Sequence, residues 1–159
     1  MTATAERKTY ATRELTLTRV FDAPRDLVFR MWTEPKHMAQ WWGPKGFTNP
    51  VCELDVRPGG AIRINMRAPN GAVYPMTGTF REIVRPERLV FISFAEDHDG
   101  LRVIESLTTV TFAEQAGKTT MTVHASAVAL APIGAQYLQG MEAGWNGSLD
   151  RLAELVARK

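Results

Sequence analysis

The chain has 159 residues, of which 45% are hydrophobic and 23% are charged, a globular composition that excludes disordered and fibrous classes. Its 19 Lys and Arg and 17 Asp and Glu residues give a net charge of +2 and are spread along the chain, which does not favour nucleic acid as a partner. The single cysteine, Cys52, excludes an intramolecular disulfide and a zinc site built from several thiolates.

No stretch approaches the roughly eighteen apolar residues of a membrane-spanning helix, and the first residues lack the apolar segment of an export signal. We therefore expect a cytoplasmic protein without a membrane span. Residues 1–11 are polar and are predicted to form a flexible tail. Residues 12–159 contain no repeat or linker and are predicted to form a single domain.

The first predicted element is a strand, in which Leu15, Leu17 and Phe21 alternate with residues that suit a pleated surface. Pro24 then breaks the strand and favours the start of a helix, because proline presets the backbone of a first helical position. That short helix ends before Pro35.

A second short helix is predicted to hold Met38, Trp41 and Trp42. It ends at Gly43-Pro44, since this pair cannot continue a helix. Two short helices are therefore expected between the first strand and the rest of a sheet.

The region from Val51 to Ala127 is predicted to be an antiparallel meander with one buried face, because short alternating segments are separated by turn-forming residues. The turns are expected at Pro58-Gly59-Gly60, Pro69-Asn70-Gly71, Arg85-Pro86-Glu87, Asp97 to Gly100 and Ala116-Gly117. In the first of these, the glycines are expected to supply positive φ angles.

The period changes after Pro132, where apolar residues recur every three or four positions as far as Val156. This pattern predicts one long helix from Pro132 to Arg158, roughly 40 Å long at about 1.5 Å per residue, around which the sheet must curl. Three glycines, Gly140, Gly144 and Gly147, follow the edge of its apolar stripe, and each costs about 1 kcal/mol relative to alanine. Either the sheet packs closely on the helix backbone there, or the missing side chains leave room for a ligand.

Several motifs in this order resemble one known family. They are Phe21-Asp22-Ala23-Pro24, Trp32-Thr33-Glu34-Pro35, Trp41-Trp42-Gly43-Pro44, Asp55-Val56-Arg57-Pro58-Gly59-Gly60, Gly78-Thr79-Phe80, Pro86-Glu87-Arg88-Leu89-Val90-Phe91 and Gly144-Trp145 with Leu149-Asp150-Arg151-Leu152. The chain is similar to the activator of Hsp90 ATPase homologue 1-like (AHSA1) family of the START-like helix-grip superfamily. The resemblance implies an α+β fold in which a curved antiparallel sheet of about six to seven strands wraps around the C-terminal helix.

The resemblance also implies a cavity between sheet and helix, which superfamily members use for lipids, sterols, polyketides or other apolar molecules. Bulky residues at inward positions, two tyrosines and one of the helical glycines are the predicted lining. They are Trp41, Met66, Tyr74, Met76, Phe80, Phe91, Tyr137, Met141, Gly144 and Trp145.

No catalytic, metal-binding or cofactor-binding residues are predicted. The three histidines, His37, His98 and His124, lie on separate elements without the spacing of a metal site. The carboxylates within strands, such as Glu53 and Glu82, have outward parity, which does not favour acid–base chemistry in the cavity.

The sequence and the resemblance leave three functions open. The first is binding of an apolar, lipid-like or polyketide-like small molecule. The second is a protein-interaction module of Hsp90-activator type, and a homodimer partner is also considered. The third is a small cyclase or lyase that uses the same cavity.

Overall fold

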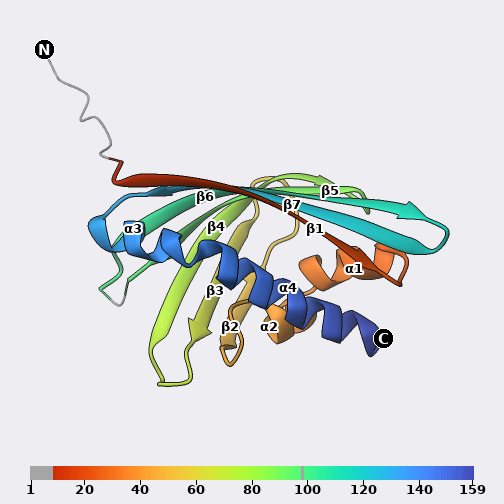
Figure 1. The fold of residues 1–159 in the computed structure, drawn as a ribbon, viewed down its shortest axis with the longest axis horizontal. Coiled ribbons are helices and arrows are strands. Elements are labelled where there is room, and N and C mark those ends of the chain that lie inside the picture. Colours follow the sequence, from red (N-terminus) through yellow and green to blue (C-terminus); the bar gives the residue numbers. More distant parts are fainter. Residues whose placement is uncertain (1–8, 98) are drawn as a thin grey trace, which may run out of the picture.

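A computed structural model describes residues 9–97 and 99–159. Seven antiparallel strands form one sheet in the order β1-β7-β6-β5-β4-β3-β2 (Figure 1). The strands are β1 (Ala11–Phe21), β2 (Thr48–Leu54), β3 (Ala61–Arg67), β4 (Val73–Val84), β5 (Arg88–Glu96), β6 (Arg102–Gln115) and β7 (Lys118–Ala129). The helices are α1 (Arg25–Thr33), α2 (Pro35–Trp41), α3 (Pro132–Gln139) and α4 (Met141–Ala157). The predicted helix-grip arrangement, with two short helices after the first strand, is confirmed.

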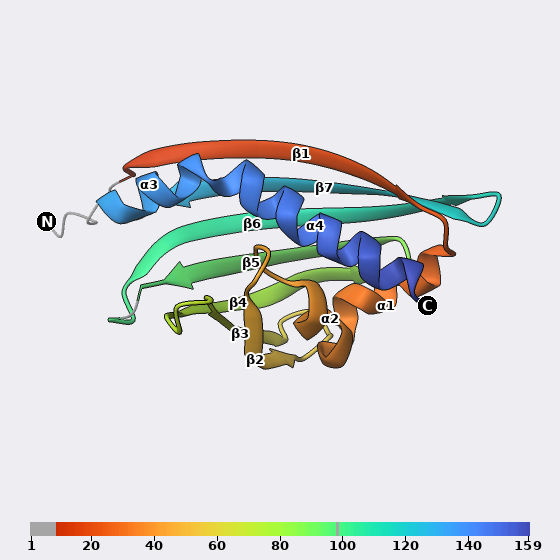
Figure 2. The same cartoon turned by 60° about the horizontal axis from the view of Figure 1, so that its bottom comes forward.

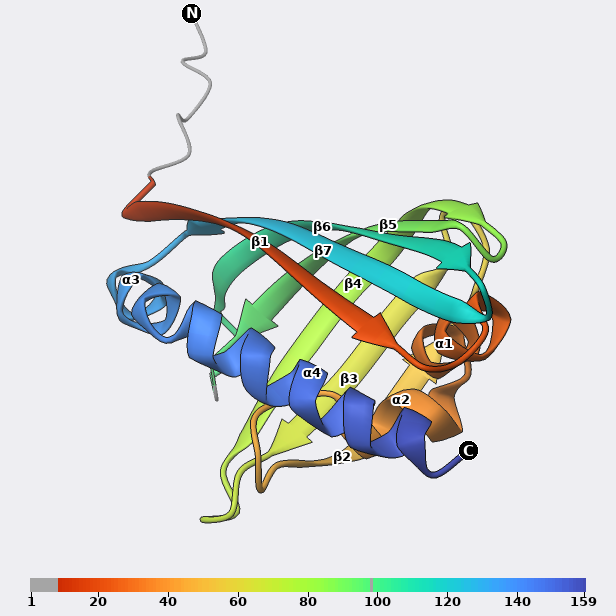
Figure 3. The same cartoon turned by 45° about the vertical axis from the view of Figure 1, so that its right-hand side comes forward.

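The sheet buries one face, as the alternation predicted. On β7, Met121 and Val123 are buried while Thr120 and Ser126 are exposed. In Figure 2, α4 lies diagonally across the sheet, and Figure 3 shows α1 and α2 at the end of the sheet where α4 finishes. In the described part of the chain, no helix is long and apolar enough to cross a membrane.

The C-terminal helix differs from the prediction, because it is divided at Gly140 rather than continuous. Gly140 has φ −92° and ψ 3° and separates α3 from α4. Arg13 of β1 reaches this break and donates hydrogen bonds to the carbonyl oxygens of Leu138 at 2.7 Å and Gln139 at 3.1 Å. The poor helix propensity of glycine and this side-chain cap on the last carbonyls of α3 together favour the break.

One turn glycine and one strand boundary also differ in detail from the sequence analysis. Gly59 has the expected positive φ of 83°, but Gly60 does not, and it is needed instead because a Cβ there would clash with the Asp55 carbonyl oxygen. β1 begins at Ala11, inside the predicted tail, and residues 1–8 of that tail lie outside the described residues, as does His98.

Aromatic side chains fill the space between sheet and helices at the end covered by α1 and α2. The Trp32 ring lies 4.7 Å from that of Trp41 and 6.3 Å from that of Trp145. It also lies 6.5 Å from the ring of Phe112 on β6. These residues tie α1, α2, α4 and the sheet into one packed core.

Arg151 of α4 fixes the segment that follows α2. Its guanidinium donates to the carbonyl oxygens of Gln40, Trp42, Gly43 and Pro44 at 3.0 to 3.1 Å. The end of a helix leaves carbonyl groups without intrahelical partners, and here a side chain from another helix supplies the donors. The Trp42–Pro44 segment is therefore held against α4.

The helical glycines provide a stability test. A Cβ at Gly134 would clash with the Val103 carbonyl oxygen, whereas a Cβ at Gly147 would lie 3.7 Å from its nearest neighbours, which is ordinary contact. We expect Gly134→Ala to lower the free energy of unfolding by about 2 kcal/mol through overpacking. Gly147→Ala should raise it by about 1 kcal/mol through helix propensity. Chemical denaturation of both variants measures this, and a shift of the same sign in both would contradict the account.

Removal of the Arg151 hydrogen bonds gives a second test. Arg151→Met keeps an apolar stem of similar length but removes the donor to the carbonyl oxygens of Gln40 and Gly43. The carbonyl oxygens of Trp42 and Pro44 keep their bonds from the Asn49 side chain and the Phe47 N–H. We therefore expect a loss of about 2 kcal/mol in the free energy of unfolding. Arg158→Met, at an exposed position just after α4, is the control and should change stability by less than about 0.5 kcal/mol. Equal effects of the two substitutions would show that Arg151 does not anchor the segment.

Candidate functional site

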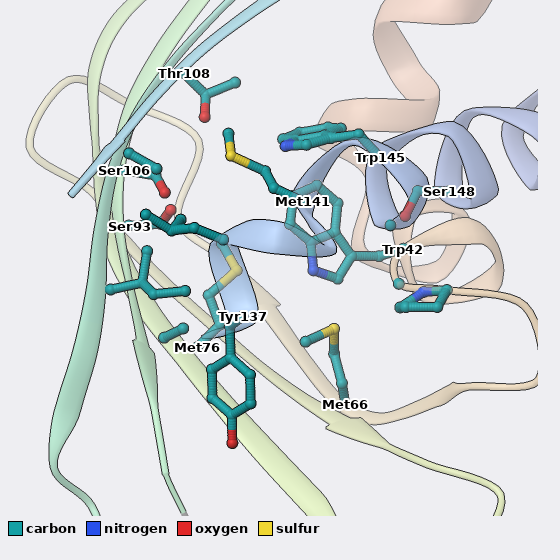
Figure 4. A pocket seen from close by; sticks show the side chains of 17 residues that line it. Trp42, Met66, Met76, Ser93, Ser106, Thr108, Tyr137, Met141, Trp145 and Ser148 are labelled. Atoms are coloured by element: carbon teal, nitrogen blue, oxygen red, sulfur yellow. The ribbon is translucent and has the colours of Figure 1, made fainter. Parts of the chain in front are cut away.

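A cavity of about 210 Å³ lies between the inner face of the sheet and the helices α3 and α4 (Figure 4). Its lining comes from β3 to β7, from α3 and α4, and from the segment after α2. The lining residues are Trp42, Gly43, Pro44, Met66, Met76, Ser93, Ala95, Ile104, Ser106, Thr108, Ala127, Tyr137, Leu138, Met141, Gly144, Trp145 and Ser148.

The cavity exists because small side chains meet across the sheet. Gly78, Ser93, Ser106 and Ala127 are directly paired on β4, β5, β6 and β7, and we call them the small-residue row. Inward side chains of serine or smaller leave the space between sheet and α4 unfilled at this level. Two positions along the strands, Phe80 pairs with Phe91 and the space is packed.

The helix contributes to the same space through Gly144. A Cβ at this position would have no atom within 4 Å, apart from its own neighbours in the helix. Of the two explanations for the helical glycines, the structure thus supports open volume at Gly144, which lines the cavity. Close packing of the helix backbone on the sheet occurs instead at Gly134.

Two tryptophans form an aromatic wall on the helix side. The ring centroids of Trp42 and Trp145 are 5.5 Å apart, with an interplanar angle of 84°. Trp145 stacks on Trp32 of the packed core, and the Trp42 carbonyl is held by Arg151. Both tryptophans are therefore held by contacts with neighbouring elements, which restricts the movement of the two indoles.

Hydroxyl groups are concentrated on the sheet side. Ser93, Ser106 and Thr108 project toward the space in front of Met141 (Figure 4), and Ser148 lies on α4. Thr108 is 1% exposed and Ser93 is 9% exposed. Among the described residues, the hydroxyl groups of these four residues make no hydrogen bond to another side chain or to the backbone. The sheet side of the cavity thus offers hydrogen-bond donors and acceptors that are available to a ligand.

None of the lining side chains carries a charge at neutral pH. Burial lowers the pKa of the Arg151 guanidinium, whose charge is directed at the carbonyl groups of the Trp42–Pro44 segment. Cys52 lies outside the lining, and burial raises the pKa of its thiol to about 11, which makes it a poor nucleophile. Within residues 9–97 and 99–159, no three His, Cys, Asp or Glu side chains gather in a way that could hold a metal ion.

Several predicted site residues meet in this cavity. These are Met66, Met76, Tyr137, Met141, Gly144 and Trp145. Tyr137 is 39% exposed and lies at the rim, with its ring directed away from Ser106 and Thr108 (Figure 4).

The other predicted residues lie elsewhere, which corrects the expected lining. Trp41 is fully buried in the core, where its indole nitrogen donates to the Met31 carbonyl oxygen at 2.9 Å. Phe80 and Phe91 border a separate void of only about 10 Å³. Tyr74 is near the start of β4 and packs on Phe47, with ring centroids 6.2 Å apart, outside the lining.

The Trp41-Trp42-Gly43-Pro44 segment was expected to close one end of the cavity, but Trp41 was predicted as the lining residue instead of Trp42, and most of the small inward residues were not predicted. Trp42 follows Trp41 directly in the chain. Which of the two indoles faces the cavity depends on where α2 ends, and it ends at Trp41. The alternation of the strands predicts inward side chains at Ser93, Ser106 and Ala127. Small residues at several inward positions were therefore the signal in the sequence that could have indicated the cavity. The predicted lining consisted mainly of bulky residues instead.

Three solved structures show how far this architecture is shared. A putative uncharacterized protein from Rhizobium leguminosarum is 29% identical, aligns over 94% of this chain and 97% of its own, and has a TM-score of 0.78. A protein from Chromobacterium violaceum is 29% identical over 90% of this chain and 96% of its own, with a TM-score of 0.75. The AHSA1 protein from Silicibacter pomeroyi is 25% identical over 91% of this chain and 98% of its own, with a TM-score of 0.74. No curated protein matches the chain.

The sequence model of one family matches residues 22–157, which is most of the chain. The matched region runs from the end of β1 to the last residue of α4, and so includes the whole cavity lining. Its description is activator of Hsp90 ATPase homolog 1-like protein, in agreement with the motifs of the sequence. The chain therefore belongs to the AHSA1 family.

Proposed function

We propose that this protein binds an apolar small molecule in the cavity between its sheet and its C-terminal helices. The observation that carries the proposal is the cavity of about 210 Å³, whose lining consists mainly of tryptophan, methionine, alanine and other apolar groups. Interiors of proteins are normally close-packed, so an unfilled apolar space of this size between sheet and helix favours an occupant. Burial of ligand surface supplies roughly 25 cal/mol per Å² before the costs of association.

The alternatives have less support. The family description favours a protein-interaction module of Hsp90-activator type, but it names no surface of this chain. A cyclase or lyase needs an acid or a base at the cavity, and Glu53, Asp55 and Glu82 are all exposed on the outside. The homodimer, through an exposed strand or helix surface, and the cytoplasmic location stay predictions.

The methionines make ligand binding directly observable. Met66, Met76 and Met141 line the cavity, whereas Met31 and Met121 are fully buried elsewhere in the core. Titration with naphthalene, followed by NMR of methionine methyl groups, is expected to shift the three lining methyl signals and to leave the signals of Met31 and Met121 nearly unchanged. Uniform small shifts, or none, would contradict the proposal.

Filling the cavity from the helix should abolish this response. Gly144→Leu places a side chain into the open volume, so naphthalene affinity should fall at least about tenfold through loss of buried contact area. Ala143→Leu adds the same side chain at the preceding, exposed position of α4 and is the matched control, with unchanged affinity. Equal affinities of the two variants would place the binding site elsewhere.

A further inference from the structure

We propose that the cavity selects neutral aromatic molecules of about ten non-hydrogen atoms with one oxygen function, which the hydroxyl groups of Ser93, Ser106 and Thr108 bind. This inference rests on the proposed function and names the chemical class of its ligand. It follows from the position of the hydroxyl groups, the volume of the cavity, its aromatic wall and its lack of charge.

The three hydroxyl groups form one polar patch on an otherwise apolar surface. Ser93 and Ser106 are paired directly across β5 and β6, and Thr108 is two residues further along β6, on the same face. These hydroxyl groups have no hydrogen-bond partner within the described protein and line the cavity, so they can bond an oxygen atom of a ligand that reaches this patch. Because a hydroxyl both donates and accepts, a phenol or an aromatic carbonyl compound satisfies it.

The volume limits the size of the ligand. An apolar cavity of about 150 Å³ holds benzene, and drug-sized ligands occupy about 300 to 1,000 Å³. The present cavity of about 210 Å³ lies between these values and fits one or two fused rings. Long acyl chains and sterols, included in the broader expectation for the superfamily, do not fit entirely inside it.

The wall opposite the hydroxyl groups suits a flat ring. Trp42 and Trp145 stand nearly perpendicular to each other, so a ring between them and the sheet has one indole face and one indole edge available. Aromatic pairs prefer such offset or edge-to-face contacts. The thioether sulfurs of Met66 and Met141 add adaptable contacts around the ring.

The absence of charge from the lining disfavours an ionised group inside the cavity. A carboxylate or an ammonium group that entered the cavity would lose its hydration without meeting an opposite charge among the lining residues. Arg151, the cation behind the Trp42–Pro44 segment, already donates to the carbonyl groups of that segment. A neutral ligand is therefore preferred over its ionised counterpart.

Three probes that share one ring system separate these requirements: naphthalene, 2-naphthol and 2-naphthoate. At neutral pH we expect the wild-type protein to bind 2-naphthol roughly tenfold tighter than naphthalene, as one or two additional hydrogen bonds predict. The ionised 2-naphthoate should bind at least about tenfold more weakly than 2-naphthol. The shifts of the Met66, Met76 and Met141 methyl signals report all three affinities in the same site.

A variant tests the hydroxyl patch itself. The combined substitution Ser93→Ala, Ser106→Ala and Thr108→Val should lower the affinity for 2-naphthol roughly tenfold, to that of naphthalene, and should leave naphthalene binding intact. Ser126→Ala, at an exposed position on β7, is the control. Retained naphthalene binding shows that the triple variant is folded, and Ser106→Ala alone replaces it if the triple variant is not.

The outcomes separate this inference from the proposed function. Equal affinity of the wild type for naphthalene and 2-naphthol, a preference that survives loss of the hydroxyl groups, or tight binding of 2-naphthoate would each overturn the inference while naphthalene still occupied the cavity. If neither neutral probe binds, the proposed function fails and the inference fails with it.

Discussion

The space beneath α4 depends on the register of four neighbouring strands. Pairing brings Gly78, Ser93, Ser106 and Ala127 into one row, so that the sheet offers no large side chain at this level. A slip of one residue along β5 would turn Phe94 inward in place of Ser93 and close the cavity. Strand register, which is set by the whole hydrophobic pattern, therefore decides whether this protein has a binding site.

The neighbouring structure keeps this space from collapsing. The aromatic core around Trp32 is packed against one end of α4, and Arg13 of β1 caps the last carbonyl groups of α3 near the other. Arg151 holds the Trp42–Pro44 segment on α4 between them. The helix is thus fixed at several points, while Gly144 adds nothing to fill the gap.

The sequence predicted the strands and helices well, because alternation, prolines and glycines act locally. The break at Gly140 was missed, since the capping side chain of Arg13 lies more than a hundred residues away in the chain. For the site, inward parity identified Met76 and the helical period identified Trp145, but parity does not give cross-strand partners. A β-bulge between Phe80 and Glu82 shifts the register, so the pairing of Phe80 with Phe91 was not readable from the pattern.

The central claim is that the small-residue row leaves a lasting cavity next to Trp145 and Met141. A crystal structure determined under xenon pressure tests it most directly, because xenon enters apolar cavities without needing a specific partner. The account predicts a xenon atom between the small-residue row and α4, in contact with the Trp145 or Met141 side chain. A packed interior in which the Trp42, Met141 and Trp145 side chains have moved onto Ser93 and Ser106, with no xenon bound, would contradict it.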